Sequence, residues 1–210
     1  AVGDTVLKGQ KIAEAGGFVS SPIYSSVSGT VKKIEPRRVA VGDMVNSIII
    51  ESDDAFKEVD YQAVDDVTTL SKEEIINRVK EAGVVGMGGA GFPTHVKLSP
   101  KEPEKIEYII ANCAECEPYL TADYRRMMEN PEELVAGMKI ILQLFDNAKG
   151  VFGVENNKPD CIAKLKELIK DEPRMEVCEL MTKYPQGGER QLIYAVTGRA
   201  INSKMLPADA

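Results

Sequence analysis

The sequence predicts an α/β protein in which a β-rich domain precedes a mostly parallel sheet with helices on both sides. Residues 1–52 contain short apolar or β-branched runs separated by turn residues, a pattern typical of strands. From residue 71 onward, helical and strand patterns alternate. Apolar residues make up 43% of the 210 residues, which is enough to build a buried core.

The β-rich region contains an internal repeat. Val2-Gly3-Asp4-Thr5-Val6 returns as Val41-Gly42-Asp43-Met44-Val45, so a Gly-Asp turn leads into a strand twice. Each copy alone would expose an apolar face, and we therefore expect two similar halves that pack face to face. The polar, acidic residues 56–70 are expected to form a linker.

A helix is expected from Ser71, because Ser71 and Glu74 have the spacing of a capping box and Gly83 supplies a left-handed stop. Asn130 is expected to cap a later helix with Pro131 at its first position. The remaining elements are expected as strands over 106–111, 149–155 and 175–180 and helices over 160–170 and from Gly187 or Gly188 to Gly198. Ligands of such sheets bind at the carboxyl ends of the strands.

Composition excludes several classes of protein. The net charge of −7 argues against a nucleic-acid surface, which needs concentrated basic residues. No apolar stretch approaches the roughly 20 residues that span a bilayer, so direct membrane insertion is not expected. The four cysteines are expected to be thiols of a reducing compartment. Since the chain starts without Met and stops without a closing element, we expect a longer protein.

Four glycines crowd the run from Gly86 to Gly91. Successive N–H groups in such a loop form a concavity for anions, and Lys97 can add a positive charge for a phosphate. The spacing of Gly86, Gly88 and Gly91 fits the dinucleotide fingerprint, although a tight structural turn explains this match about as well.

An acidic turn, Asn112 to Tyr119, directly follows the strand that ends at Ala111. Asn112 can read an amide edge of a ligand, while Glu115 and Glu117 can accept from hydroxyl or ring N–H donors. A plain polar turn is the alternative, but we favour function because so many acceptors follow one strand. We expect this turn to face the same pocket as the glycine loop.

The cysteine pair in this turn, Cys113 and Cys116, could suggest a metal or redox site. Cys161 and Cys178 stand singly, so nothing completes a tetrahedral ligand set and no metal is expected. His95 is the only histidine, and a lone histidine beside a loop is more often structural. We therefore assign no catalytic acid, base or nucleophile.

A third run, Tyr184 to Gln191, separates the last strand from the last helix. Gly187 and Gly188 permit close backbone approach, and the helix start favours a phosphate or ring oxygen. Tyr184 could stack on a planar ring. By itself this run is only a glycine-rich turn.

Together the three runs resemble two related families. Gly86–Lys97 is similar to the flavin loop of the NADH-binding 51 kDa subunit of respiratory complex I. Ala114–Arg125 and Thr182–Glu189 are similar to RnfC-like chains, the C subunits of Rnf electron transport complexes, and the resemblance covers nearly the whole chain. Complex I subunits have arginine where Met87 stands and aspartate where Ala114 stands, whereas RnfC-like chains share the alanine.

This resemblance implies a barrel-sandwich-hybrid domain over 1–55, similar to biotinyl or lipoyl carriers, and a Rossmann-like FMN- and NADH-binding domain over 71–210. The first domain lacks a modifiable lysine in a Met-Lys-Met turn, so it is expected to be structural and not a carrier. The implied FMN contacts are Gly86, Gly88, Gly89, Ala90, Gly91, Lys97, Asn112, Glu115, Tyr184, Gly187 and Gly188. The implied NADH-side residues are Phe92, Glu117 and Glu189.

The implied function is that of an NADH-linked oxidoreductase subunit. Electrons would move between NAD(H) and ferredoxin through FMN and through iron–sulfur clusters held beyond Ala210. The expected partners are the other subunits of an Rnf-type membrane complex, with ferredoxin reached indirectly. The expected location is peripheral, on the cytoplasmic face of the membrane. The alternative is a non-catalytic scaffold subunit of a related sodium-pumping quinone reductase that binds no flavin.

Overall fold

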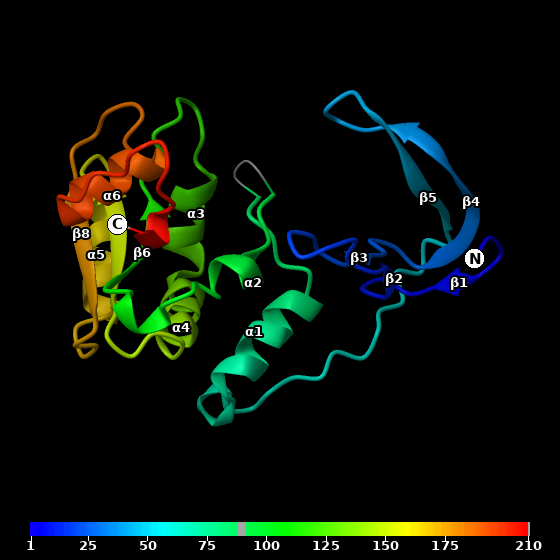
Figure 1. Cartoon of the computed structure of the whole chain (residues 1–210), viewed down its shortest axis with the longest axis horizontal. Coiled ribbons are helices and arrows are strands. Elements are labelled where there is room, and N and C mark those ends of the chain that lie inside the picture. The colour runs from blue at the N-terminus through cyan, green and yellow to red at the C-terminus, as the bar shows by residue number, and fades with distance from the viewer. Residues whose placement is uncertain (88–90, 210) are drawn as a thin grey trace. The chain divides into compact units, whose positions relative to one another are not determined.

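The structure is a computed structural model that describes residues 1–87 and 91–209 (Figure 1). Gly88, Gly89, Ala90 and Ala210 lie outside the described residues. The chain forms two compact units, Ala1–Leu98 and Ser99–Ala210.

The first unit contains two small antiparallel sheets. One has the order β1-β4-β5 and the other pairs β2 with β3. The strands are β1 (Thr5–Val6), β2 (Lys11–Ala13), β3 (Ile23–Tyr24), β4 (Gly29–Arg38) and β5 (Met44–Ser52). β4 and β5 form a long hairpin that stands out in Figure 1.

The repeated Gly-Asp turns have the same backbone geometry. Gly3 and Gly42 have φ values of +94° and +96°, which favour glycine, and each turn precedes a strand. The strands that follow, β1 and β5, both pair with β4. β1 and β5 are thus the two neighbours of β4 in one sheet, where their backbone groups pair with those of β4. The expectation of halves packed face to face is therefore wrong for the repeat itself.

Helix α1 (Lys72–Glu81) starts and stops as predicted. The Glu74 N–H donates to Ser71 Oγ at 3.3 Å, and the Ser71 N–H donates to Glu74 Oε2 at 2.8 Å, which completes the capping box. Gly83 has φ +67°, and a Cβ there would lie 2.8 Å from a ring carbon of Tyr24. The first unit also contains the 3₁₀ turn η1 (Val67–Thr69) and the short helix α2 (Thr94–Lys97).

The second unit is built on a parallel sheet with the order β6-β7-β8. The strands are β6 (Tyr108–Cys113), β7 (Lys149–Glu155) and β8 (Met175–Leu180). The predicted bounds of β7 and β8 are confirmed, whereas β6 lies two residues further along the chain than expected. β7 is the central strand, and Val151, Phe152 and Val154 on it are fully buried.

Helices cover both faces of this sheet. They are α3 (Ala122–Glu129), α4 (Pro131–Leu142), α5 (Pro159–Leu168) and α6 (Glu189–Thr197), with 3₁₀ turns η2 (Pro103–Lys105) and η3 (Pro207–Asp209). A Cβ at Gly150 would clash with Met138 of α4, and a Cβ at Gly153 would clash with Leu192 of α6. Since residues three apart on a strand point to opposite faces, α4 and α6 lie on opposite sides of β7.

One predicted helix cap is wrong. Asn130 occupies the position before α4, but its side chain makes no capping hydrogen bond. Asn130 also closes α3, where its N–H donates to the carbonyl of Arg126, and its backbone (φ −134°, ψ 48°) departs from the extended geometry of a cap. Pro131 starts α4 as expected.

Across the described residues, every helix is too short or too polar to cross a bilayer.

Candidate functional site

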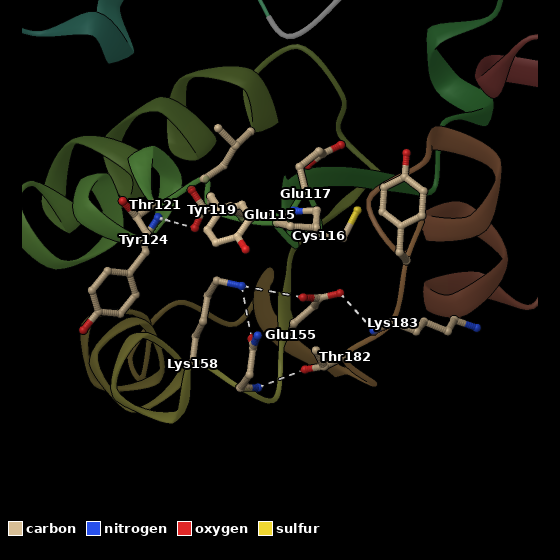
Figure 2. A pocket seen from close by; sticks show the side chains of 14 residues that line it. Glu115, Cys116, Glu117, Tyr119, Thr121, Tyr124, Glu155, Lys158, Thr182 and Lys183 are labelled. Atoms are coloured by element: carbon tan, nitrogen blue, oxygen red, sulfur yellow. Dashed lines mark hydrogen bonds and ion pairs between the residues drawn. The ribbon is translucent and has the colours of Figure 1, made fainter.

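A hollow of about 410 Å³ opens in the second unit, where the parallel strands end (Figure 2). Glu155 is the last residue of β7, and the other lining residues follow β6, β7 or β8. The lining is Glu115, Cys116, Glu117, Pro118, Tyr119, Leu120, Thr121, Tyr124, Glu155, Asn157, Lys158, Thr182, Lys183 and Tyr184. The site thus lies at the edge of the sheet where ligands of parallel sheets bind.

The acidic turn after β6 is held by its own side chain. Glu115 has φ +52°, and its carboxylate accepts from the N–H groups of Asp123 at 2.7 Å and Tyr124 at 3.1 Å. A negative charge at a helix N-terminus is favourable, so Glu115 caps α3 from outside the helix. Both carboxylate oxygens of Glu115, a predicted ligand contact, therefore already accept hydrogen bonds within the fold.

A buried ion pair lies beneath this turn. Lys158 Nζ donates to the Ala114 carbonyl at 2.7 Å and to Asn157 Oδ1 at 3.1 Å, and lies 3.7 Å from Glu155 Oε2. The other carboxylate oxygen of Glu155 accepts from the Lys183 N–H at 3.3 Å. Figure 2 shows Lys158 beside Glu155, and Glu155 beside Lys183. Two hydrogen bonds and one ion pair therefore hold the Lys158 ammonium group, which fixes the start of the acidic turn to the end of β7.

The acidic turn and the run Tyr184 to Gln191 are in contact at Asn112, Cys116 and Gly187, which we call the seam. Asn112 Nδ2 donates to the Gly187 carbonyl at 2.8 Å, and the Gly187 N–H donates to Cys116 Sγ at 3.2 Å. A Cβ at Gly187 would lie 3.3 Å from both Asn112 Oδ1 and Cys116 Sγ, which is tighter than ordinary contact. Residues 75 positions apart are therefore joined at the carboxyl edge of the sheet.

Other predicted residues stand open around this seam. Tyr184 is 71% exposed and lines the hollow together with the exposed Glu117. Gly188 precedes α6 and Glu189 is the first residue of that helix. Glu117 and Tyr184 thus line one hollow, and the binding role of these residues stays a prediction.

The glycine loop belongs to the first unit. The Gly86 N–H donates to the Phe92 carbonyl at 2.9 Å, and the Thr94 N–H donates to the Val84 carbonyl at 3.0 Å, so the two ends of the loop are held together. Gly91 has φ +64°, Phe92 is 43% exposed, and Lys97 is exposed at the end of α2. Gly88, Gly89 and Ala90 are outside the described residues, and a shared pocket with the acidic turn stays a prediction.

The acidic turn carries clustered negative charge. Desolvation, and then the carboxylates of Glu115 and Glu117, raise the pKa of Asp123. Such a surface repels phosphate and suits hydroxyl or N–H donors of a ligand. The chemistry of this edge therefore favours the hydroxyl and N–H groups of a ligand over its phosphate.

The cysteines show no reactive arrangement. Burial raises the pKa of the Cys113 thiol to about 12 and that of Cys161 to about 11, so both stay protonated at neutral pH. Within residues 1–87 and 91–209, no group of three or more His, Cys, Asp or Glu side chains is placed to hold a metal ion. His95 is buried in α2.

Sequence reasoning missed the groups that organise the hollow. Glu155, Lys158 and Thr182 were not singled out from the sequence as site residues. Each has a partner on another loop, namely Lys183 for Glu155, Ala114 for Lys158 and Asn157 for Thr182. One signal was available: a carboxylate that ends a strongly apolar strand is rarely left buried without a partner.

Residues 79–210 match the family described as the Nuo51 FMN-binding domain. Residues 1–55 match the family described as the RnfC barrel sandwich hybrid domain.

Several curated proteins are similar to the chain. It is 46% identical to the C subunit of the Na⁺-translocating ferredoxin:NAD⁺ oxidoreductase complex of Acetobacterium woodii, with 99% of this chain and 47% of the relative covered. It is 44% identical to the C subunit of the proton-translocating ferredoxin:NAD⁺ oxidoreductase complex of Clostridium ljungdahlii, with 99% and 45% covered. The chain thus spans about half the length of these relatives.

A solved structure is similar as well. The crystal structure of an NAD⁺-reducing NiFe hydrogenase in the air-oxidized state matches with a TM-score of 0.52 and 27% identity. The match covers 61% of this chain and 24% of that chain.

Proposed function

The chain belongs to the RnfC family, and from this premise we propose that it forms the NADH- and FMN-binding region of a membrane-associated electron transport complex. Its relatives are named as C subunits of ferredoxin:NAD⁺ oxidoreductase complexes. Residues 1–55 would then be a barrel-sandwich-hybrid scaffold, and residues 71–210 a Rossmann-like FMN- and NADH-binding domain. The partners would be other subunits of the complex, on the cytoplasmic face of the membrane.

The observation that carries the proposal is the seam between Asn112, Cys116 and Gly187. A Cβ at Gly187 would lie only 3.3 Å from Asn112 Oδ1 and Cys116 Sγ, so the backbone approaches the acidic turn closely beside Cys116, which lines the hollow. Beside it, Tyr184 exposes a ring that suits stacking against a flavin. These groups fit a planar, hydroxyl-bearing ligand such as FMN.

The remaining assignments follow from position. Gly86, Gly88, Gly89, Ala90, Gly91 and Lys97 would hold the phosphate, and Asn112, Gly187 and Gly188 would position the flavin. Phe92, Glu117 and Glu189 would face NADH. Glu115 would act mainly by fixing the acidic turn, because its carboxylate already caps α3.

When bound, FMN supplies the exchange between two-electron hydride transfer and single-electron transfer. The residues of this chain would orient the two rings and keep water from the contact between them. The single electrons would leave through iron–sulfur clusters held by residues outside this sequence, toward ferredoxin.

A flavin titration tests the proposal. We expect FMN fluorescence to be quenched when the chain is added, and the quenching to disappear in Gly89→Asp, which sets a carboxylate against the proposed phosphate site. Gly17→Asp is the matched control, because Gly17 has open space around it in the first unit.

The same titration should be repeated with a chain as long as the curated relatives. Quenching by the longer chain alone would show that further residues complete the site. Without quenching by either chain, the flavin proposal fails, and the non-catalytic scaffold of a sodium-pumping quinone reductase becomes the better interpretation.

A further inference from the structure

Gln186 carries a buried oxygen that has no partner. The residue is only 3% exposed, and within the described part of the chain its Oε1 accepts no hydrogen bond. Buried side-chain oxygens are nearly always paired in folded proteins, because leaving one unpaired costs stability. An exception of this kind calls for an explanation, and a partner that binds the protein is one.

The position of Gln186 links it to the seam. Its backbone N–H donates to the Lys183 carbonyl at 2.9 Å in a tight turn, and Lys183 and Tyr184 both line the hollow. The next residue, Gly187, is the one held by Asn112 and Cys116. The unpaired oxygen therefore belongs to a residue that lies in sequence between Tyr184, on the side of the hollow, and Gly187, on the side of the seam.

The neighbouring amide of Asn112 is occupied within the fold. Its Nδ2 donates to the Gly187 carbonyl at 2.8 Å, and its Oδ1 accepts from the Ala114 N–H at 3.4 Å. The sequence alone assigned the reading of a ligand's amide edge to Asn112. In the structure both groups of the Asn112 amide have partners, whereas Gln186, the residue before Gly187, has an unused acceptor.

We propose that Gln186 Oε1 accepts a hydrogen bond from the bound flavin, either from the ring imide N3–H or from a ribityl hydroxyl. This inference rests on the proposed function. An unpaired buried acceptor raises the free energy of the empty site and becomes satisfied only when a donor arrives, and because Gln186 is buried, its turn would open for the flavin. Gln186 would then be a binding residue that orients the flavin.

The test is Gln186→Met, which keeps the length of the side chain and removes the amide. We expect FMN to bind about tenfold more weakly, which corresponds to about 1.4 kcal/mol. We expect the Tm of the ligand-free chain to stay the same or rise, because an unsatisfied group has been removed. A residue with a purely structural role would lower the Tm, so the opposite signs of the two effects identify a ligand-directed group.

Gln143→Met is the matched control, since Gln143 caps the end of α4 and leads toward the amino ends of the strands. Its FMN affinity should equal that of the wild type. Gln186→Leu serves as a second variant if Gln186→Met folds poorly.

Flavin analogues separate the two donors. If the ring N3–H is the donor, the wild type should bind N3-methylriboflavin about tenfold more weakly than riboflavin, and Gln186→Met should bind both equally. If a ribityl hydroxyl is the donor, the difference between wild type and variant should disappear with lumiflavin, which lacks the ribityl chain.

Equal FMN affinity of the wild type and Gln186→Met would overturn the inference and leave the proposed function standing. A lower Tm of the ligand-free variant would also overturn it, because the oxygen would then be satisfied in the empty protein. If the wild type binds no flavin at any length of chain, the proposed function fails and the inference fails with it.

Discussion

The two edges of the parallel sheet in the second unit use polar groups in opposite ways. At the amino edge, the Arg174 guanidinium donates to the carbonyls of Leu142 at 3.2 Å and Ala148 at 2.8 Å, and also to Phe145. Leu142 ends α4, and Phe145 and Ala148 lie in the turn that follows it, so the guanidinium joins this turn to the start of β8.

At the carboxyl edge, polar groups are only partly used. The pair of Glu155 and Lys158 is buried and satisfied, yet next to it Glu115 has a positive φ and Gln186 keeps an unpaired oxygen. Backbone strain and unpaired groups persist only where the surrounding structure enforces them, and they concentrate at functional sites. We infer that the amino edge serves stability and the carboxyl edge serves a ligand.

The largest expected effect is that of Lys158→Met. It leaves the Glu155 carboxylate buried without its partner, which should cost about 3–5 kcal/mol in the free energy of unfolding. Urea denaturation would measure the loss, and FMN affinity should fall as well because the acidic turn loses its anchor at Ala114. Adding Glu155→Gln should recover part of the stability, since no unpaired charge then remains.

A loss below about 1 kcal/mol in Lys158→Met would contradict this expectation. It would mean that the pair exchanges freely with water.

A smaller effect is expected from Arg174→Met at the amino edge. The loss of hydrogen bonds from a charged group to helix carbonyls should cost about 1–3 kcal/mol. FMN affinity, measured by fluorescence below the melting transition, should stay within about twofold of the wild type, because the amino edge lies away from the proposed site. Weaker FMN binding in this variant would contradict the separate roles that we infer for the two edges.

The smallest effect concerns pH. Desolvation and the neighbouring carboxylates raise the pKa of Asp123 in the folded chain, so the folded state holds this proton more tightly than the unfolded state. The stability contribution of the proton is present below the unfolded pKa and is lost as the pH rises through the folded pKa. Asp123→Asn should therefore stabilise the chain at neutral pH, by less than about 1 kcal/mol because of solvent screening.

The gain from Asp123→Asn should vanish in acid, where the wild-type carboxyl is itself protonated. Thermal melts at pH 7 and pH 3 give the two values. An equal gain at both pH values would show that charge is not its cause.

The strands of the second unit were predictable because their signals are local. β7 has an apolar centre and β8 places apolar residues around two glutamates, both are bounded by turn residues, and both ends of each were predicted. α1 was equally clear, since its capping box and stop glycine lie within the helix ends. Local chemistry therefore determines these elements.

The missed features depend on contacts distant in sequence. α3 was not predicted because its cap is Glu115, well before the first helical residue. The anchoring role of Lys158 depends on Ala114, 44 positions away. Asn112 and Glu115 were chosen as ligand contacts from their chemistry, but only the fold reveals that their polar atoms already have partners.

An NMR titration of the isotope-labelled chain with FMN tests most directly whether FMN binds at the carboxyl edge of the sheet. We expect amide resonances to shift at the carboxyl edge, at Cys116, Gly187 and Gly188, and in the glycine loop from Gly86 to Gly91. Amides at the amino edge, such as those of Arg174 and Met175, should stay in place. Shifts confined to the amino edge, with the carboxyl edge unchanged at saturating FMN, would contradict the claim.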